Sequence, residues 1–437
     1  MPVRSFRPFR HRGYLLVWVG ALVSNIGTWM ETTALSYFVA DTSSAGASGL
    51  VAAAGFVPTA LLAPLGGAWA DRFDRRRIIA VSNTLFGLVS VAVALLVSTG
   101  HATPGRLAVL SLLGGCMSAV SWPAFQALLP DLVPADDLVA AIGLSSTQWN
   151  LGRIVGPSAA AVAIALGGVA TALWINAASF VAVIVTVLAA PVPRRAGVRR
   201  RVLVAMRDAY RFARVTSSVR AMVPLMVLIV LFGSPFLGLV AQMATNVFGA
   251  DQSGTSLLVT AQGIGAVTAG ASMGSLSARF GVGRVLLTAG ALLVPAHVLY
   301  GLAPTIVVAV PAVAVAGGCY MASLSSCASI TQRAASADMR GRAMMVNNIV
   351  LGAAYPVGVL AQGVLADVAS LRAVTVGAGV VLGVAMLAVV AGRGPTTVMA
   401  LLDGSDGVGE MWDSGERDRQ GGVAAPDAAG ARIRRRS

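Results

Sequence analysis

Long apolar stretches alternate with short polar segments along most of the chain, and the polar segments are rich in arginine, glycine and proline. A helix needs about 20 predominantly apolar residues to cross the hydrocarbon core of a bilayer, and the stretches are of that order. The pattern predicts twelve membrane-spanning helices. They cover residues 14–40, 48–69, 78–100, 106–128, 139–165, 169–191, 221–247, 254–277, 284–303, 305–329, 343–366 and 371–392.

The composition points to an all-α integral membrane protein. Of the 437 residues, 56% are hydrophobic and 11% are charged, whereas about 25% are charged in soluble domains. This balance excludes an ordinary soluble enzyme. Cys116, Cys319 and Cys327 all lie within apolar stretches, without the spacing of a disulfide framework or a zinc site.

The charge distribution predicts the orientation of the chain. The net charge is +14, and 29 of the 32 arginines lie on one side of the predicted spans, with only Arg106 and Arg372 on the other. Cytoplasmic loops carry this excess of positive charge. We expect a multi-pass protein of the cell inner (cytoplasmic) membrane with both termini in the cytoplasm, whose arginines contact anionic headgroups rather than nucleic acid.

Shifts in composition divide the chain into five parts. They are a cytoplasmic N-terminus at 1–13, a six-helix bundle at 14–191, an arginine-rich linker at 192–220, a second six-helix bundle at 221–392 and a cytoplasmic tail at 393–437. Within the linker, residues 202–214 place apolar side chains on one helical face among arginines, which is typical of an interfacial helix. A solvated linker is the alternative. The tail lacks a periodic apolar face, so we expect it to be disordered.

An internal repeat relates the two bundles. Residues 67–79 match residues 274–286 at an offset of 207, with a glycine, two arginines, a phenylalanine and two aliphatic positions in common. The same offset carries Asp131 onto Asp338. Two six-helix halves related as parallel repeats are one of the ways in which transporters are built.

The loop between the second and third spans carries a recognisable motif. Gly67, Asp71, Arg72, Arg75 and Arg76 follow the spacing Gly-x3-Asp-Arg-x2-Arg-Arg. This loop resembles the signature loop of the major facilitator superfamily, and the matching segment between the eighth and ninth spans resembles its degenerate copy. The resemblance implies the major facilitator fold, with twelve transmembrane helices in two six-helix pseudo-repeat halves.

A second motif lies in the fifth span. Gly143, Gly152, Gly156 and Pro157 follow the spacing Gly-x8-Gly-x3-Gly-Pro, which is similar to the antiporter motif of the same superfamily. The chain thereby resembles the branch of enterobactin and macrolide exporters, whose members are drug:proton antiporters. The resemblance implies export coupled to protons.

The residues of the signature loop suit a conformational role. Gly67 allows two helices to approach closely, and Asp71 can accept hydrogen bonds from the start of another helix or pair with arginine. By resemblance, that helix is the eleventh span, whose start carries Arg340 and Arg342, and the contact steadies the outward-open state. A plain cluster of positive-inside charges is the alternative.

The small residues of the antiporter motif suit close packing. Gly152, Gly156 and Pro157 would thin and bend the fifth span where it faces the other half. Such packing would disfavour a leak open to the cytoplasm and would suit export. Ordinary packing of small residues is the alternative.

Two charged residues lie deep in the predicted spans, Glu31 in the first and Arg153 in the fifth. An ionisable group at such depth is costly and is by default a functional hypothesis. Counted from the cytoplasmic ends, they lie roughly 25 Å and 21 Å along their helices, so we expect them to be able to meet. Glu31 would carry a coupling proton or meet a cationic substrate, while Arg153 would modulate the pKa of Glu31 or receive an anionic group. A buried structural ion pair is the alternative.

Polar and aromatic residues in the spans that form the central cavity of this superfamily are candidates for substrate contacts. They are Asn25, Trp29, Trp122, Asn150, Gln242, Gln262, Asn347 and Tyr355. Any one of them is also explained by contacts between helices.

These observations favour a secondary active transporter that exports a small amphipathic compound, such as a drug, an antibiotic or a siderophore-like molecule, by alternating access. The sequence contains no Gly-x4-Gly-Lys-Ser/Thr loop for ATP, so we expect the proton gradient to supply the energy, with no cofactor and no metal, and a monomer. An importer or facilitator of the same superfamily is the main alternative. A membrane enzyme and a non-transporting sensor are less consistent with the sequence.

Overall fold

The computed structural model describes residues 6–191, 202–336 and 339–403. Helices make up nearly all of this part of the chain, and eleven helical stretches within it are long and apolar enough to cross a membrane. One of these stretches contains two of the predicted spans. The prediction of an all-α membrane protein is therefore confirmed.

The first half is built from five helices. They are α1 (Arg12–Thr42), α2 (Ala45–Arg72), α3 (Arg75–Ser98), α4 (Pro104–Leu132) and α5 (Leu138–Ala189), preceded by the 3₁₀ turn η2 (Arg7–Arg10) and interrupted by η3 (Ala135–Asp137). Helix α5 reverses direction at Gly167 and Gly168, where the backbone is not helical. Gly168 has φ +77°, a conformation that glycine adopts without steric cost. The fifth and sixth predicted spans are thus the two arms of α5.

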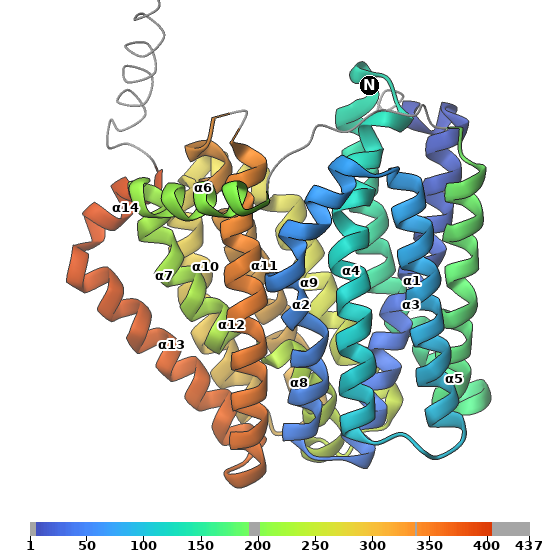
Figure 1. Ribbon diagram of the computed structural model, residues 1–437. Coiled ribbons are helices and arrows are strands. Elements are labelled where there is room, and N and C mark those ends of the chain that lie inside the picture. Colours follow the sequence, from blue (N-terminus) through green and yellow to red (C-terminus); the bar gives the residue numbers. More distant parts are fainter. Residues whose placement is uncertain (1–5, 192–201, 337–338, 404–437) are drawn as a thin grey trace, which may run out of the picture.

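The linker helix α6 (Val202–Val215) leads into the second half. In Figure 1 it lies across one end of the bundle, at a steep angle to the membrane-length helices. The second half contains α7 (Ser217–Gly233), α8 (Phe236–Gln242), the π-helical turn η4 (Met243–Val247), α9 (Gln252–Phe280), α10 (Val282–Leu302), α11 (Ile306–Ala334), α12 (Arg340–Val368), α13 (Leu371–Arg393) and α14 (Pro395–Asp403).

Two sequence-based expectations require correction. The predicted helix over 221–247 is broken between α7 and α8, because Ser234 turns its hydroxyl onto the Val230 carbonyl at 2.5 Å and Pro235 has no N–H to continue the ladder. The tail predicted to be disordered from residue 393 begins with α14, whose Asp403 accepts a hydrogen bond from the Gly283 N–H at 2.7 Å. The remainder of the tail, 404–437, lies outside the described residues.

The alternating direction of the helices defines two faces. The linker face carries α6 and the loops at 73–74 and 133–137, and the opposite face carries the loops at 43–44, 99–103 and 369–370. The repeat identified in the sequence places equivalent turns on the linker face. Asp74 caps the start of α3 by accepting from the Arg76 N–H at 2.9 Å, whereas Gly281, with φ +82°, precedes α10 at the matching position.

Candidate transport site

A cavity of about 810 Å³ lies between the two halves. Helices α1, α3, α4 and α5 line it from the first half, and α9 and α11 line it from the second. Its polar lining comes mainly from the first half and includes Asn25, Asn83, Ser121, Gln126, Gln148 and Asn150. Many apolar side chains complete the wall, so the cavity has the amphipathic character of a small-molecule site.

Three tryptophans from different helices form a continuous aromatic wall. The rings of Trp122 on α4 and Trp149 on α5 lie 5.1 Å apart between centroids, and Trp149 meets Trp29 of α1 edge-on at 5.9 Å. Both geometries are favourable for aromatic pairs. Trp122 and Trp149 line the cavity directly, whereas Trp29 lies behind Trp149. Such a wall can hold the apolar part of a bound molecule.

The structure brings part of the candidate set to this cavity. Asn25, Trp122 and Asn150 line it, and Trp29 joins it through the aromatic wall. The Asn150 amide donates to the Ser146 carbonyl one turn earlier at 2.8 Å.

The other four candidates lie elsewhere. Tyr355 on α12 stacks against Phe56 of α2 with 4.6 Å between ring centroids. Asn347 accepts a hydrogen bond from the Thr331 hydroxyl at 3.1 Å, which joins α11 to α12. Gln262 is buried on α9, where its main chain approaches α11 closely. In each case the rotation of the helix, which the sequence does not specify, directs the side chain away from the cavity.

Gln242 has a role in closing the opposite face. Its amide nitrogen donates to the carbonyl oxygens of Ser43 and Ser44 at 3.0 and 2.9 Å and to the Ser48 hydroxyl at 3.0 Å. Ser43 and Ser44 form the turn between α1 and α2, and Ser48 lies at the start of α2, all in the first half, whereas Gln242 belongs to the second. It is therefore an inter-half contact rather than part of the cavity.

A carboxylate strengthens the same closure. Asp367, near the end of α12, accepts hydrogen bonds from the Ala45 N–H at 2.8 Å, the Gly46 N–H at 3.0 Å and the Ser44 hydroxyl at 2.8 Å. The carboxylate thus occupies the N-terminus of α2, where the free N–H groups and the helix dipole favour a negative charge. Asp367 and Gln242 together hold the two halves shut at the opposite face.

Glu31 and Arg153 do not form the predicted pair. The Glu31 carboxylate accepts hydrogen bonds from the Ser90 hydroxyl at 2.8 Å and from the Asn176 amide. Arg153 instead places its guanidinium carbon 5.5 Å from the centroid of the Trp29 ring. Trp29 and Glu31 are two residues apart and thus about 200° apart around α1. The two charges lie on different sides of the helix, and the prediction that they meet is wrong.

Arginines of the signature loop hold helix ends within the first half. Arg75 donates from Nη1 to the Ala127 carbonyl at 2.7 Å and to the Asp131 carboxylate at 2.5 Å, at the end of α4. Arg76 donates to the Val187 carbonyl at 3.1 Å, at the end of α5. Cations at helix C-termini complement the free carbonyls and the dipole.

The predicted contact of Asp71 with the start of the eleventh span cannot be placed. Gly67, Asp71 and Arg72 belong to α2, but their side chains lie outside the described part of the chain. At the start of α12, Arg340 is exposed and Arg342 donates to the Asp208 carboxylate of α6 at 2.6 Å. Arg342 therefore anchors the linker helix to α12.

Two glycines of the antiporter motif, Gly152 and Gly156, face α1. A Cβ at Gly156 would lie 2.4 Å from the Trp29 Cβ, and one at Gly152 would lie 3.1 Å from the Asn25 Cβ. Gly143 has open space around it. The expectation that this packing faces the other half is wrong, because these glycines bring α1 and α5 of the same half together. Pro157 is buried in the same arm of α5.

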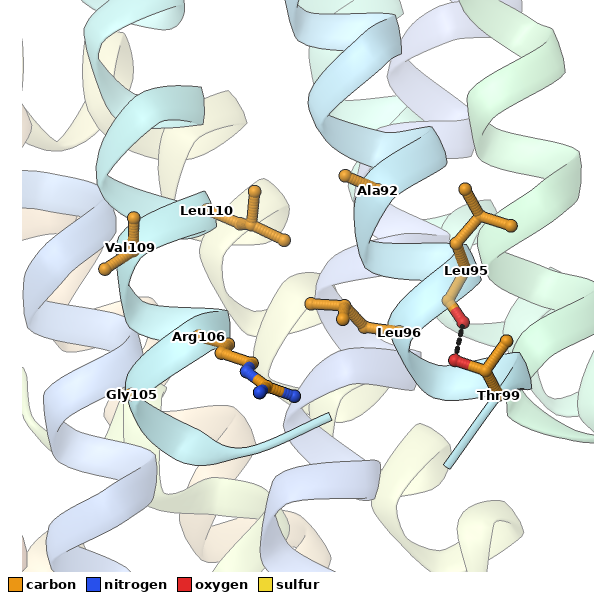
Figure 2. Close-up of a pocket in the computed structure, with 8 residues that line it drawn as sticks. All are labelled: Ala92, Leu95, Leu96, Thr99, Gly105, Arg106, Val109 and Leu110. Atoms are coloured by element: carbon orange, nitrogen blue, oxygen red, sulfur yellow. Dashed lines mark hydrogen bonds between the residues drawn. The ribbon is translucent and has the colours of Figure 1, made fainter. Parts of the chain in front are cut away.

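A second groove, of about 540 Å³, lies between α3 and α4 near the opposite face. Figure 2 shows Leu96 and Leu110 on its two sides and Arg106 at its end. The Arg106 guanidinium donates to the His101 carbonyl at 2.8 Å. The groove involves only one half of the molecule, so it does not have the location that alternating access requires.

Comparisons with known proteins identify the family. A family model described as transmembrane secretion effector, within the major facilitator superfamily, matches residues 3–409. The chain belongs to this family. It is a multi-pass membrane transporter that binds small molecules, and it is not an enzyme. The resemblance to the major facilitator superfamily is thereby confirmed.

Several relatives of the transporter carry efflux or siderophore names. The multidrug efflux pump Tap of Mycolicibacterium fortuitum is 27% identical over 373 residues, which cover 82% of this chain and 90% of the relative. Macrolide efflux protein A of Streptococcus pyogenes is 22% identical over 41% of this chain and 45% of the relative. The staphyloferrin A transporter of Staphylococcus aureus is 32% identical over a matched segment of 143 residues. This segment covers 32% of this chain and 36%, about a third, of the relative.

Solved structures share the fold of the transporter. The nucleoside transporter NupG, in a mutant form, superposes with a TM-score of 0.73 at 14% identity and covers 86% of this chain and 99% of its own. A bacterial homologue of the human lysosomal transporter Spinster, inward-facing and occupied, gives 0.69 at 16% identity, covering 88% and 96%. The transporter and these structures therefore share one overall fold.

Sequence reasoning missed two contributors to the site, Trp149 and Asp367. Trp149 precedes Gly152 and Gly156 by three and seven residues, so helical spacing alone places it on their face. Asp367 had a weaker signal, because an acid at the end of an apolar span is common at membrane boundaries.

Proposed function

We propose that the transporter exports a small amphipathic compound in exchange for protons by alternating access between the two faces. The observation that carries this proposal is the central cavity, which the contacts of Asp367 and Gln242 close toward the opposite face. The arginine-rich linker face is the cytoplasmic one by the positive-inside rule. In this arrangement the cavity receives its substrate from the cytoplasm.

The lining supports an amphipathic substrate. The tryptophan wall offers apolar surface, and the amides of Asn25, Gln148 and Asn150 offer hydrogen bonds. The relatives Tap and macrolide efflux protein A are named as efflux proteins, which supports export as the direction.

Glu31 is the proton carrier in this proposal. Its described partners are neutral, the Ser90 hydroxyl and the Asn176 amide, and no cationic side chain of the described chain pairs with it within salt-bridge distance. A carboxylate with neutral donors at such depth is able to take up and release a proton during the cycle. Substrate and proton then compete for the same conformational state of the transporter, so the binding of one favours the release of the other.

The test is transport in proteoliposomes with an imposed pH gradient, using ethidium and erythromycin as probes. Wild type is expected to move at least one probe against its gradient and to release protons in the opposite direction. Glu31→Gln is expected to lose the proton movement while it retains probe binding, and Asp41→Asn, at the exposed end of the same helix, serves as the matched control. Probe movement that is independent of the pH gradient, or an unchanged Glu31→Gln variant, would reject proton coupling.

A further inference from the structure

Arg153 is a buried cation without an anionic partner in the part of the chain that the structure describes. Only 7% of the residue is exposed, and within the described residues no carboxylate lies within salt-bridge distance of it. The described contact of its guanidinium is the face of Trp29, at 5.5 Å. A buried charge is normally paired and hydrogen-bonded, because its desolvation is costly. The unpaired state of Arg153 therefore requires an explanation.

The position of Arg153 provides that explanation. Its neighbours Asn150 and Ile154 on α5 both line the central cavity, and Trp149 lies one helical turn before it. Arg153 does not itself line the cavity, but it lies next to these lining residues at the end of the cavity nearer the opposite face. Gly263 of α9, in the second half, lies against Arg153. A Cβ added to this glycine would lie 3.6 Å from the Arg153 Cγ.

A second polar group in the same place is also unsatisfied. The indole N–H of Trp29 is buried and has no hydrogen-bond partner among the described residues, although the ring packs on Arg153 and meets Trp149. Buried donors without acceptors are rare in folded proteins. Two donors, one of them charged, thus lie together directly behind the aromatic wall at one end of an otherwise amphipathic cavity.

We propose that Arg153 and Trp29, directly behind the wall formed by Trp149, extend the cavity with an anion-binding end, and that the exported compound carries a carboxylate on an aromatic or other flat apolar body. A guanidinium fork matches a carboxylate in a bidentate geometry. The tryptophan wall then holds the apolar body through ring contacts. This inference rests on the proposed export function and names the substrate class for the same site.

Charge neutralisation links binding to transport. Arg153 lies in the seam between the halves, with Trp29 of the first half on one side and Gly263 of the second on the other. A bound carboxylate removes the uncompensated charge from this seam. A compound that binds the next conformational state more tightly than this one then shifts the equilibrium toward that state.

The experiment measures thermal unfolding of the purified full-length protein with two matched probes, 2-naphthoate and the neutral 2-naphthylmethanol. A ligand that binds only the folded state raises the unfolding midpoint. We expect naphthoate to raise the midpoint of wild type by about 3 °C at saturating concentration, and the alcohol to raise it by less than half as much. Arg153→Met removes the naphthoate shift, and Arg106→Met, in the groove of Figure 2, retains it.

The opposite results overturn the proposal. Equal shifts with naphthoate and the alcohol in wild type, or a naphthoate shift that persists in Arg153→Met, exclude an anion site at this residue. Arg153→Lys keeps the charge but not the planar fork, and a weakened naphthoate shift is expected, so the test does not depend on folding of the methionine variant.

Transport separates this inference from the proposed function. If proteoliposomes export ethidium or erythromycin while wild type shows no naphthoate preference, the anion site is refuted and export stands. If the naphthoate shift depends on Arg153 while none of the probes, naphthoate included, is transported, the site stands and export is refuted.

Discussion

The Asp367 carboxylate caps the helix that begins at Ala45 in the other half of the molecule, with 2.8 Å between its Oδ1 and the Ala45 nitrogen. Ser44, the N-cap residue of α2, donates its hydroxyl to the same carboxylate and accepts from the Ala47 N–H at 3.3 Å. The N-terminus of α2 is therefore capped by residues of both halves. A helix cap that depends on an inter-half contact links the local free energy of α2 to the conformational state of the transporter.

Removal of the Asp367 charge is expected to favour the state that is open at the opposite face. Asp367→Asn weakens charge-assisted hydrogen bonds and costs the closed state about 1–2 kcal/mol, which is a population change of about 5–30-fold. Spin labels at His101 and Thr305, on loops of the two halves at this face, report the change as a longer distance in double electron–electron resonance.

The matched control for this variant is Asp403→Asn. Asp403 also caps a helix start, that of α10, but within the second half. Its replacement is expected to leave the distance between the labels unchanged. A distribution in Asp367→Asn that equals wild type would show that the carboxylate does not bias the conformational equilibrium.

Substitution of Gly156 is expected to separate α1 from α5. An added methyl group would lie 2.4 Å from the Trp29 Cβ and 3.0 Å from the Ile26 carbonyl oxygen, so Gly156→Ala forces the backbones apart and costs about 1–3 kcal/mol. Gly143→Ala, on the same helix with nothing within 4 Å, is expected to be neutral or to stabilise by up to about 1 kcal/mol. Thermal unfolding of both variants measures the difference, and equal midpoints would contradict the packing role of Gly156.

The helices were predictable because their signals are local. The length of each apolar stretch sets a membrane span, and the pair Gly167–Gly168 marks the reversal within α5 because glycine permits the positive φ found there. The break at Pro235 carried a similar local signal, but the apolar residues around it form an uninterrupted run that favours one helix.

The arrangement of the site was harder to predict because it depends on helix rotation and on contacts between distant segments. The predicted depths of Glu31 on α1 and Arg153 on α5 place the two residues at a similar level in the membrane. Depth alone does not determine on which side of α1 each side chain lies. Gln242 has a polar side chain of the kind that lines transport cavities, yet its partners are backbone carbonyls of the other half. Such contacts form only once both halves are folded and docked, so no single segment encodes them.

The linker helix is expected to loosen when its contact with α12 is lost. Arg342 and Asp208 pair at 2.6 Å, with side-chain exposures of 29% and 26%, and such a partly exposed pair contributes about 0.2–1 kcal/mol. Asp208→Asn is therefore expected to change the unfolding midpoint little but to speed tryptic cleavage at the arginines of α6. The control is Asp136→Asn, in the loop before α5. Equal cleavage rates in both variants would mean that apolar contacts alone hold α6.

The stability that Asp251 contributes is expected to depend on pH. It lies outside the membrane spans and caps α9, and hydrogen bonds from the Ser253 hydroxyl and from the Ser253 and Gly254 N–H groups hold the pKa of its carboxyl below the ordinary value. Because the pKa is lower in the folded state, this contribution is complete above the ordinary pKa of about 4 and is lost as the pH falls through the folded value. Asp251→Ala is expected to cost about 1 kcal/mol at pH 7.

The difference between Asp251→Ala and wild type should therefore shrink in acid. Unfolding midpoints measured at pH 7 and over a series of decreasing acidic pH values report this change, because the contribution is lost as the pH falls through the lowered pKa of the folded state. Asp41→Asn, at the exposed end of α1, serves as the control for the general effect of acid on the protein. Since a protonated carboxyl still accepts from the backbone but without charge, part of the cap remains at low pH. A difference between the two proteins that stays as large throughout the acid series as at pH 7 would show that the cap does not depend on the charge of Asp251.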